Sequence, residues 1–337
     1  MNFSATGGMK GAPHVHERFP ELRESLPYLR LGTAPSPVSK LPSEMRSSGE
    51  LWLKDEAPYG DGGWGGNKVR KLEWLIPDAQ RKGAKTIFTV GALGTNWGLA
   101  TARYGRDHGM DVALALVDQP IDDHVRAQLE RLKESGATLH FTHNKARTVA
   151  MAPLLLAKHT SGLTPPYYLP AGGSSPVGTI GYVEASLELA AQVERGELPE
   201  PERVVCAVGS GGTIAGLTLG LKLAGLKSRP VGVVVNDALK LDPPTLLKLA
   251  KKTEQVLRDR GAQLPDSDLT TADFDAPLDW LGAGYGHSTP EGEQALALAR
   301  DLAGLQLEPV YTAKALAGAM AQTCDGPVLF INTNGPR

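Results

Sequence analysis

The chain has 337 residues, of which 41% are hydrophobic and 21% are charged, a composition typical of globular proteins rather than disordered ones. A formal net charge of −2 gives no electrostatic reason to expect nucleic acid or a membrane surface as a partner. No run approaches the ~20 apolar residues of a membrane helix, and residues 1–24 lack the apolar segment of a secretory signal. We therefore expect a soluble, cytoplasmic protein, long enough for two lobes.

Short apolar runs alternate with amphipathic, helix-like segments along the chain. In the predicted helix 122–135, Val125, Leu129 and Leu132 lie on one stripe, and 179–194 has the same periodicity. The predicted strands are continuous apolar runs, typical of strands buried on both faces. They are 51–54, 86–90, 112–117, 138–142, 167–170, 204–208, 231–235 and 328–332. This alternation predicts an α/β fold with mostly parallel, doubly wound sheets, which bind ligands at the carboxyl ends of their strands.

The sequence contains no pattern typical of a metal site. Its two cysteines, Cys206 and Cys324, lack metal-ligand spacing, and the eight histidines form no pair with zinc spacing. We therefore expect no catalytic metal.

A turn with the chemistry of a phosphate site follows the predicted strand 204–208. It reads Gly209, Ser210, Gly211, Gly212 and Thr213, and a helix begins at once. Glycines let an anion approach the backbone, the N–H groups of the first helical turn point at it, and two hydroxyls add donors. The turn therefore predicts a phosphate cradle. A tight turn without a ligand is the alternative.

The sequence around this turn limits the kind of phosphate. No Gly-Lys-Ser/Thr follows, so it is not a Walker A loop. A dinucleotide fingerprint would need glycine at position 214, which is Ile214. Asp237 follows the next strand and could hold a ribose, so a nucleotide-dependent oxidoreductase stays an alternative of a different class.

A lysine lies at the predicted start of another helix. Residues 65–73 read GGNKVRKLE and follow the glycine-rich loop 60–66, which places Lys68 in the first helical turn. The positive end of a helix should lower the proton affinity of this amine, which favours the neutral form needed for a Schiff base. A simply solvated lysine is the alternative.

Residues 91–98 form a third turn from strand to helix. Backbone N–H groups here could receive a substrate carboxylate, and the Asn96 amide could bond a cofactor oxygen. Capping of the helix by Thr95 or Asn96 is the alternative, and it is compatible with ligand binding.

In chain order, these segments resemble the pyridoxal-phosphate family that contains D-cysteine desulfhydrase and 1-aminocyclopropane-1-carboxylate deaminase. The resemblance extends from about Leu31 to Gly335. It is carried by GGNKVRKLEWL, VGALGTNWG, PAGGSSPVGTIGYVEASLEL, GSGGTIAGL, GAGYGHSTPEG, LEPVYTAKALAG and VLFINTNG. It implies the tryptophan synthase β-like fold (fold type II), with two doubly wound, open parallel-sheet domains. Residues 1–81 together with 177–337 would form a large domain that binds pyridoxal 5'-phosphate, and 82–176 a small inserted domain.

The resemblance also implies roles for matching residues. Lys68 matches the Schiff-base lysine, which also moves the Cα proton, and Asn96 matches the asparagine that bonds the ring hydroxyl. Residues 209–213 match the phosphate loop, with Lys71 near the phosphate. Thr95 takes the place of a serine close to the substrate carboxylate. The family usually has His or Gln where this chain has Trp97, so the substrate-binding set becomes Thr95, Asn96 and Trp97.

Three further positions concern catalysis. Tyr285 and Tyr311 match two active-site tyrosines, with a surface position for Tyr285 and a core position for Tyr311 as alternatives. Thr312 matches the partner of the pyridine nitrogen, where the deaminase has glutamate and the desulfhydrase threonine. A neutral hydroxyl cannot hold the ring protonated, and the resulting weaker electron sink should serve when a good leaving group such as thiolate departs.

These matches predict a lyase that acts on a small amino acid. We expect a β-elimination like that of D-cysteine desulfhydrase, which yields pyruvate, ammonia and sulfide. The alternatives within the resemblance are 1-aminocyclopropane-1-carboxylate deaminase, a lyase for another β-substituted amino acid, and a cofactor carrier without turnover. A homodimer is expected by analogy.

Overall fold

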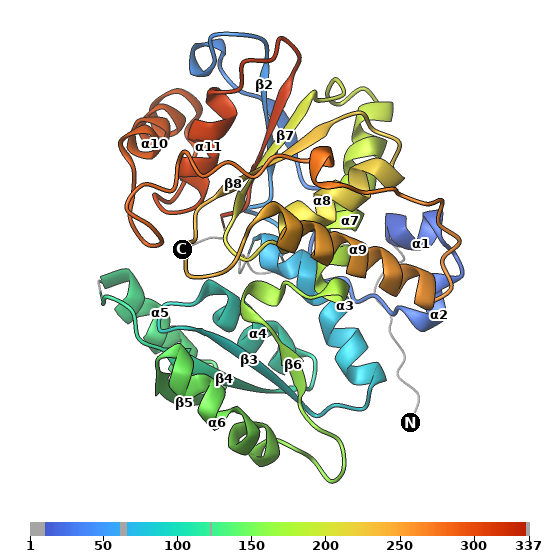
Figure 1. The fold of residues 1–337 in the computed structure, drawn as a ribbon, viewed down its shortest axis with the longest axis vertical. Helices are drawn as coiled ribbons and strands as arrows, with labels where there is room; N and C mark the ends of the chain where they lie inside the picture. The colour runs from blue at the N-terminus through green and yellow to red at the C-terminus, as the bar shows by residue number, and fades with distance from the viewer. Residues whose placement is uncertain (1–10, 61–65, 122, 335–337) are drawn as a thin grey trace.

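Two lobes, each built around one sheet, make up the molecule. A computed structural model describes residues 11–60, 66–121 and 123–334. Most of the predicted loop 60–66, including Gly65 of its motif, lies outside the described residues, as do Asp122 and Gly335. Figure 1 shows helix α3 (Asn67–Arg81) running between the lobes. We call the lobe with the five-stranded sheet the large lobe and the lobe with the four-stranded sheet the small lobe.

The large-lobe sheet has the strand order β1-β2-β9-β7-β8. Its strands are β1 (Val38–Lys40), β2 (Leu51–Asp55), β7 (Arg203–Val208), β8 (Arg229–Val234) and β9 (Val328–Asn332). All neighbours are parallel except β1, which pairs antiparallel with β2 at one edge. The sequence did not predict β1, because three residues with mostly exposed side chains carry no apolar run.

The small-lobe sheet is parallel throughout, in the order β5-β4-β3-β6. Its strands are β3 (Thr86–Ala92), β4 (Asp111–Val117), β5 (Thr138–His143) and β6 (Tyr167–Leu169). All eight predicted strands are present with ends within two residues of the predicted ones, which confirms the α/β class with two open, mostly parallel sheets. The four strands of this sheet, β3 to β6, are consecutive in the chain, which agrees with a small inserted domain. The domain boundaries at 81/82 and 176/177 stay a prediction.

Helices cover the sheets of both lobes (Figure 1). Those of the small lobe are α4 (Asn96–Asp107), α5 (Asp123–Glu134) and α6 (Lys145–Lys158). Those of the large lobe are α1 (His14–Arg18), α2 (Leu22–Ser25), α7 (Pro176–Glu194), α8 (Gly212–Leu223), α9 (Pro243–Asp259), α10 (Pro290–Ala303) and α11 (Thr312–Met320), and the 3₁₀ turns are η1 (Ser43–Met45), η2 (Ala171–Gly173) and η3 (Thr271–Asp273). Helix α7 begins three residues before its prediction, because Ser175 caps it and Pro176 suits the first helical position.

One apolar core continues from the small lobe through α3 into the large lobe. Leu72 and Leu75 of α3, Ile87 of β3 and Leu219 of α8 all belong to it and are fully buried. Because apolar side chains cover α3 from both lobes, the start of this helix has a defined position between the two sheets.

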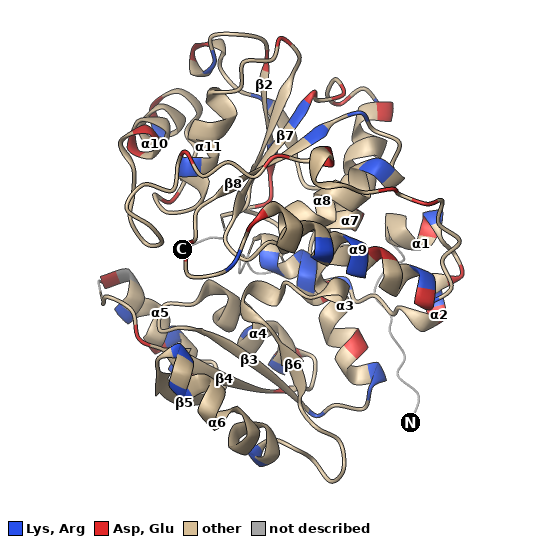
Figure 2. Cartoon of the chain, in the orientation of Figure 1, with Lys and Arg blue, Asp and Glu red and all other residues tan. Residues whose placement is uncertain are grey.

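Charged side chains lie mainly on the helices and loops. Figure 2 shows acidic and basic segments mixed over both lobes, while β3 and β4 are uncharged along most of their length. Within residues 11–60, 66–121 and 123–334, no helix is both long and apolar enough to cross a bilayer. Over the same ranges, no group of three or more His, Cys, Asp or Glu side chains is arranged to hold a metal ion.

A fully buried ion network fixes α3 to its neighbours. The Arg70 guanidinium donates to both carboxylate oxygens of Glu56, and its Nη2 lies 2.9 Å from Glu188 Oε1 on α7. Lys54 Nζ on β2 lies 2.6 Å from the same Glu188 oxygen. None of these four side chains is more than 1% exposed. Two cations thus compensate two anions in a water-excluded layer beneath α3.

Removing Arg70 should destabilise the protein strongly. In Arg70→Met, Glu56 loses its cation and Glu188 keeps only Lys54, and an uncompensated buried charge costs about 3–5 kcal/mol. Urea unfolding measures this loss. The matched control is Arg300→Met, because Arg300 pairs with Asp301 at the surface and both are at least 60% exposed. Exposed pairs contribute about 0–1 kcal/mol. Equal losses in the two variants would contradict the stabilising role of the network.

Candidate active site

Lys68 occupies the first turn of α3, as predicted, and is half-buried. Burial lowers the pKa of its amine to about 8, while the charge of Glu308 acts in the opposite direction. The predicted loss of proton affinity is therefore confirmed, but its main cause is desolvation rather than the helix end. At this pKa a minority of the Lys68 amine is neutral near physiological pH, far more than for an ordinary lysine, and the neutral amine is the form that attacks carbonyl groups.

Lys71 brings a second amine to the same place, one turn further along α3. Its Nζ donates to the Gly172 carbonyl at 2.9 Å and lies 3.4 Å from Ser174 Oγ. Burial, and then the charge of Lys68, lower the pKa of Lys71 to about 7. Binding an anion beside Lys71 would favour its charged form, so the site is built to gain from a negative ligand.

The predicted phosphate cradle lies where β7 passes into α8. Gly211 caps α8 with φ +90°, a left-handed conformation that favours glycine. A Cβ on Gly212 would lie 2.7 Å from Ser174 Oγ and 2.9 Å from Lys71 Nζ. The loop therefore approaches a cation so closely that only glycine fits without a shift of its neighbours. Free N–H groups, hydroxyls and an ammonium group are the donors that a phosphate requires.

Ser174 is a residue of this site that the sequence analysis missed. Its Oγ accepts a hydrogen bond from the Gly212 N–H at 2.9 Å and lies 2.8 Å from Ser210 Oγ. It thus links η2 to the glycine loop. The signal was present in the PAGGSSPVG segment, in which two glycines precede two serines, but that segment has no spacing that points to phosphate.

The start of α4 carries the predicted substrate-binding residues. Thr95 is the N-cap, and its hydroxyl accepts the Gly98 N–H at 3.1 Å, so the capping weighed as the alternative for this turn is present. Asn96 is exposed, and its Oδ1 accepts a hydrogen bond from Gln128 on α5. Gln128, which the sequence did not single out, therefore orients the Asn96 amide and leaves its NH₂ group available.

Trp97 differs from its expected role. The side chain is 4% exposed, and its Nε1 donates to Thr89 Oγ1 on β3 at 2.8 Å. A Cβ on Gly173 would lie 2.4 Å from the indole ring, so the ring packs directly against η2. Because indole has a single donor, this arrangement leaves none for a substrate. We correct the expectation of direct substrate contact to one of packing behind the glycine turn.

Tyr311 and Tyr285 form a pair beside the cradle. The Tyr311 hydroxyl donates to the Tyr285 hydroxyl at 2.6 Å. The two rings are edge to face, with their centroids 5.9 Å apart. A Cβ on Gly209 would lie 2.6 Å from the Tyr311 ring, which places this ring against the glycine loop. Tyr285 is 42% exposed, and its N–H donates to Asp237. Burial raises the pKa of Tyr311 well above its ordinary value.

Thr312 begins α11 and is 1% exposed. Its Oγ1 accepts the Glu308 N–H at 3.0 Å, and its own N–H donates to Glu308 Oε1 at 2.6 Å. Glu308 is itself buried, and its charge acts on Lys68. The sequence analysis did not identify Glu308, although it stands directly before the Pro-Val-Tyr-Thr segment.

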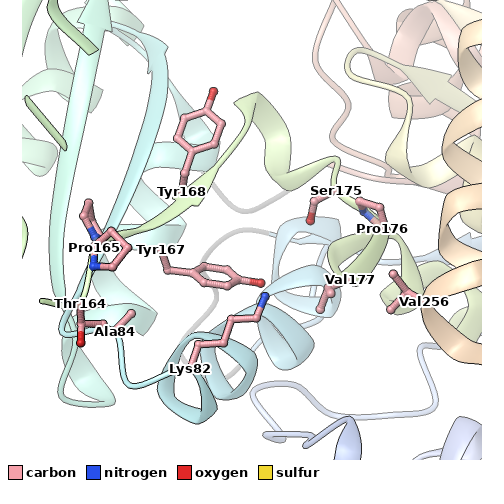
Figure 3. A pocket seen from close by; sticks show the side chains of 11 residues that line it. Lys82, Ala84, Thr164, Pro165, Tyr167, Tyr168, Ser175, Pro176, Val177 and Val256 are labelled. Carbon is pink, nitrogen blue, oxygen red and sulfur yellow. The ribbon is translucent and has the colours of Figure 1, made fainter. Parts of the chain in front are cut away.

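A separate hollow of about 470 Å³ opens between the lobes (Figure 3). Tyr167, Tyr168 and Lys82 line it from one side and Val177 and Val256 from the other. The structure describes every predicted site residue, and none of them lines this hollow. It is therefore distinct from the site at Lys68.

Residues 29–334 match the family described as pyridoxal-phosphate dependent enzyme. The chain belongs to this family. It is 34% identical over 324 residues to D-cysteine desulfhydrases of Salmonella paratyphi A and Salmonella newport, with 92% of this chain and 94% of each relative covered.

Solved structures agree with this assignment. The structure of an ACC deaminase homologue is 28% identical, with a TM-score of 0.79 over 96% of this chain and 95% of that one. A serine racemase from Dictyostelium discoideum has a TM-score of 0.65 at 14% identity, over 96% and 97% of the two chains, and shows the shared fold alone. The predictions of an enzyme, of fold type II and of pyridoxal phosphate are thereby confirmed, and the nucleotide-dependent alternative is set aside.

Labelling should show the lowered proton affinity of Lys68 directly. With the cofactor removed, acylation of Lys68 should be half-maximal near pH 8, because only the neutral amine reacts and its pKa is about 8. A free lysine side chain has an ordinary pKa of ~10.4 and serves as the reference in the same tube. Tandem mass spectrometry separates Lys68 from Lys71. A midpoint at the reference value would contradict the burial of this amine.

The glycine loop provides a second prediction. Gly211→Ala should reduce affinity for pyridoxal phosphate about tenfold or more, equivalent to at least ~1.4 kcal/mol, because a left-handed Ala reorients the first N–H groups of α8. Gly225→Ala is the matched control at the other end of α8, since Gly225 has φ +76° and open space around it. Both should lose about 1–2 kcal/mol of stability. Equal cofactor affinity in the two would contradict the cradle. Fluorescence titration of the apoenzymes measures it.

Proposed function

We propose that the protein catalyses β-elimination from a small β-substituted amino acid, in the manner of a D-cysteine desulfhydrase. The observation that carries this proposal is a pair of interacting amines of lowered pKa on one turn of α3, Lys68 and Lys71, with Lys71 Nζ only 2.9 Å from where a Cβ on Gly212 of the cradle would lie. The desulfhydrase relatives, similar over 92% of the chain, support the reaction class. Thr312, a threonine at the position that the resemblance assigns to the ring-nitrogen partner, supports elimination of thiolate.

The residues fit the cofactor. Lys71 and the loop 209–213 would hold the phosphate, Lys68 would bind the aldehyde carbon, and Asn96 would bond the ring hydroxyl. At the phosphate end, the loop lies so close to the Lys71 amine that a Cβ on Gly212 would be 2.9 Å from its Nζ, which brings backbone and amine donors together. When bound, pyridoxal phosphate supplies an electron sink for the negative charge that develops at Cα.

The chain itself supplies binding and proton transfer. The Lys68 amine would take the Cα proton as a positioned general base. Thr95 and the N–H groups at the start of α4 would receive the substrate carboxylate. The hydrogen-bonded pair of Tyr311 and Tyr285 lies beside the glycine loop and would contact the group that leaves from Cβ. With D-cysteine, the Cα–H and Cβ–S bonds would break, sulfide would leave, and one water molecule would hydrolyse the remaining enamine to pyruvate and ammonia.

We also propose that the enzyme works in the cytoplasm as a homodimer, with a free amino acid as its substrate. The analogy to the family supports the dimer. Light scattering of the purified holoenzyme would measure its mass against the 35.7 kDa of one chain.

An amino-acid panel tests the reaction. The holoenzyme should release sulfide and pyruvate from D-cysteine, and Lys68→Ala should lower kcat by about 10²–10⁴-fold, the usual contribution of a positioned general base. Lys251→Ala, on the exposed face of α9, is the matched control and should retain full activity.

Two results would count against the proposal. Keto-acid release from 1-aminocyclopropane-1-carboxylate without sulfide from D-cysteine would favour the deaminase alternative. Borohydride trapping of the cofactor on a lysine other than Lys68 would remove the assigned base.

A further inference from the structure

The turn that carries Tyr285 cannot keep its shape by itself. We call residues 281–287 the tyrosine turn, and its glycines at positions 282, 284 and 286 have positive φ angles between +65° and +114°. Glycine loses more conformational freedom on folding than any other residue, so a turn with three glycines needs contacts from other segments to hold one geometry. The place of Tyr285 depends on those contacts.

Two charged side chains of the large lobe hold the tyrosine turn. Lys314 Nζ on α11 donates to the Leu281 carbonyl at 2.8 Å, at the beginning of the turn. Asp237, three residues after the end of β8, accepts the Tyr285 N–H at 3.0 Å through its Oδ1. A Cβ on Gly284 would lie 2.8 Å from Asp237 Oδ2, so the turn packs closely against this carboxylate. Asp237 therefore fixes the backbone of Tyr285.

Asn236 connects the same segment to the glycine loop. Its Nδ2 donates to the Gly209 carbonyl at 2.8 Å, and its Oδ1 accepts the Ala238 N–H at 2.9 Å. The side chain is 8% exposed and is bonded at both ends of its amide, which leaves it one orientation. Because Gly209 is the first residue of the cradle, Asp237, which follows Asn236 directly, has a defined position relative to the cradle.

These contacts close into a ring that begins and ends at the glycine loop. From Gly209 they pass through Asn236 and Asp237 to the backbone of Tyr285. They return through Tyr311, whose hydroxyl donates to the Tyr285 hydroxyl at 2.6 Å and whose ring would lie 2.6 Å from a Cβ on Gly209. Tyr285 is thus held at its N–H by Asp237 and at its hydroxyl by Tyr311, and both holding groups are connected to the cradle.

We propose that Asp237 is a positioning residue that holds Tyr285 beside the glycine loop, with Asn236 as its connection to that loop. The inference rests on the proposed function, under which the tyrosine pair contacts the group that leaves from Cβ. It also gives a different role to a carboxylate that the sequence left open as a ribose ligand. Asp237 is exposed, so its replacement removes the acceptor for the turn without opening the core.

Kinetics and cofactor titration separate positioning from a general structural role. In Asp237→Ala, kcat for the best substrate of the amino-acid panel should fall about tenfold or more, the factor that a hydrogen bond to a charged group usually contributes. Its affinity for pyridoxal phosphate should stay near the wild-type value, because Lys71 and the loop 209–213 are unchanged. Asp237→Asn keeps an Oδ1 acceptor and should restore most of the lost kcat. Asn236→Ala frees Gly209 as well, so it should lower both quantities.

Hydrogen–deuterium exchange of the holoenzyme, read by mass spectrometry, measures the hold on the turn without any reaction. The Tyr285 amide should exchange about tenfold or more faster in Asp237→Ala than in the wild type, because its charged acceptor is gone. Gly284→Ala is an independent variant that displaces the turn from the carboxylate, and it should show the same faster exchange and lower kcat. Asp301→Ala removes an exposed carboxylate of α10 and should match the wild type in both measurements.

Three results would overturn the inference. Equal exchange of the Tyr285 amide in the wild type and in Asp237→Ala would show that the carboxylate does not hold the turn. Faster exchange with an unchanged kcat would show that the hold has no part in turnover. A loss of kcat in Asp237→Asn as large as that in Asp237→Ala would show that the acceptor is not what matters. Absence of elimination by the wild type would instead remove the proposed function, and the exchange rates would still report whether Asp237 holds Tyr285.

Discussion

The ion network around Arg70 fixes α3, the helix that carries Lys68 and Lys71, against the large lobe. Arg70 follows Lys68 by two residues, so the two side chains leave α3 in nearly opposite directions. The guanidinium is held by Glu56 after β2 and by Glu188 on α7, and Lys54 completes the charge balance. Because these bonds are directional and fully buried, they define how far α3 can rotate or slide. The position of the Lys68 amine depends on them.

The site gathers positive charge into a place that water reaches poorly. Burial lowers the pKa of Lys68 to about 8 and that of Lys71 to about 7, so both amines exchange protons close to physiological pH. An anionic ligand at the glycine loop and the carboxylate of Glu308 would offset these charges from two sides. This balance suits a lysine that must serve in turn as a nucleophile and as a base.

Both lobes contribute to the site. The cradle follows the carboxyl end of β7 and Thr95 follows that of β3, so the two sheets direct the ends of their strands toward the same region. Helix α3 and the turn η2 join these halves, since Lys71 bonds Gly172 and Ser174 bonds the glycine loop. The Trp97 ring fills the space behind η2, which explains why a large side chain is tolerated there without contact to a ligand.

The sequence by itself determined the parallel α/β architecture, the eight predicted strands and the glycine loop, because these depend on local apolar runs and on backbone freedom at glycines. The ordered motifs also identified Lys68, Lys71 and the tyrosine pair by resemblance. Only the tertiary structure decided that burial lowers the pKa of Lys68, that the Trp97 N–H donates to Thr89, and that Glu308 accepts the N–H groups of Tyr311 and Thr312. These effects depend on desolvation and on partners that the packing of whole helices and strands brings together.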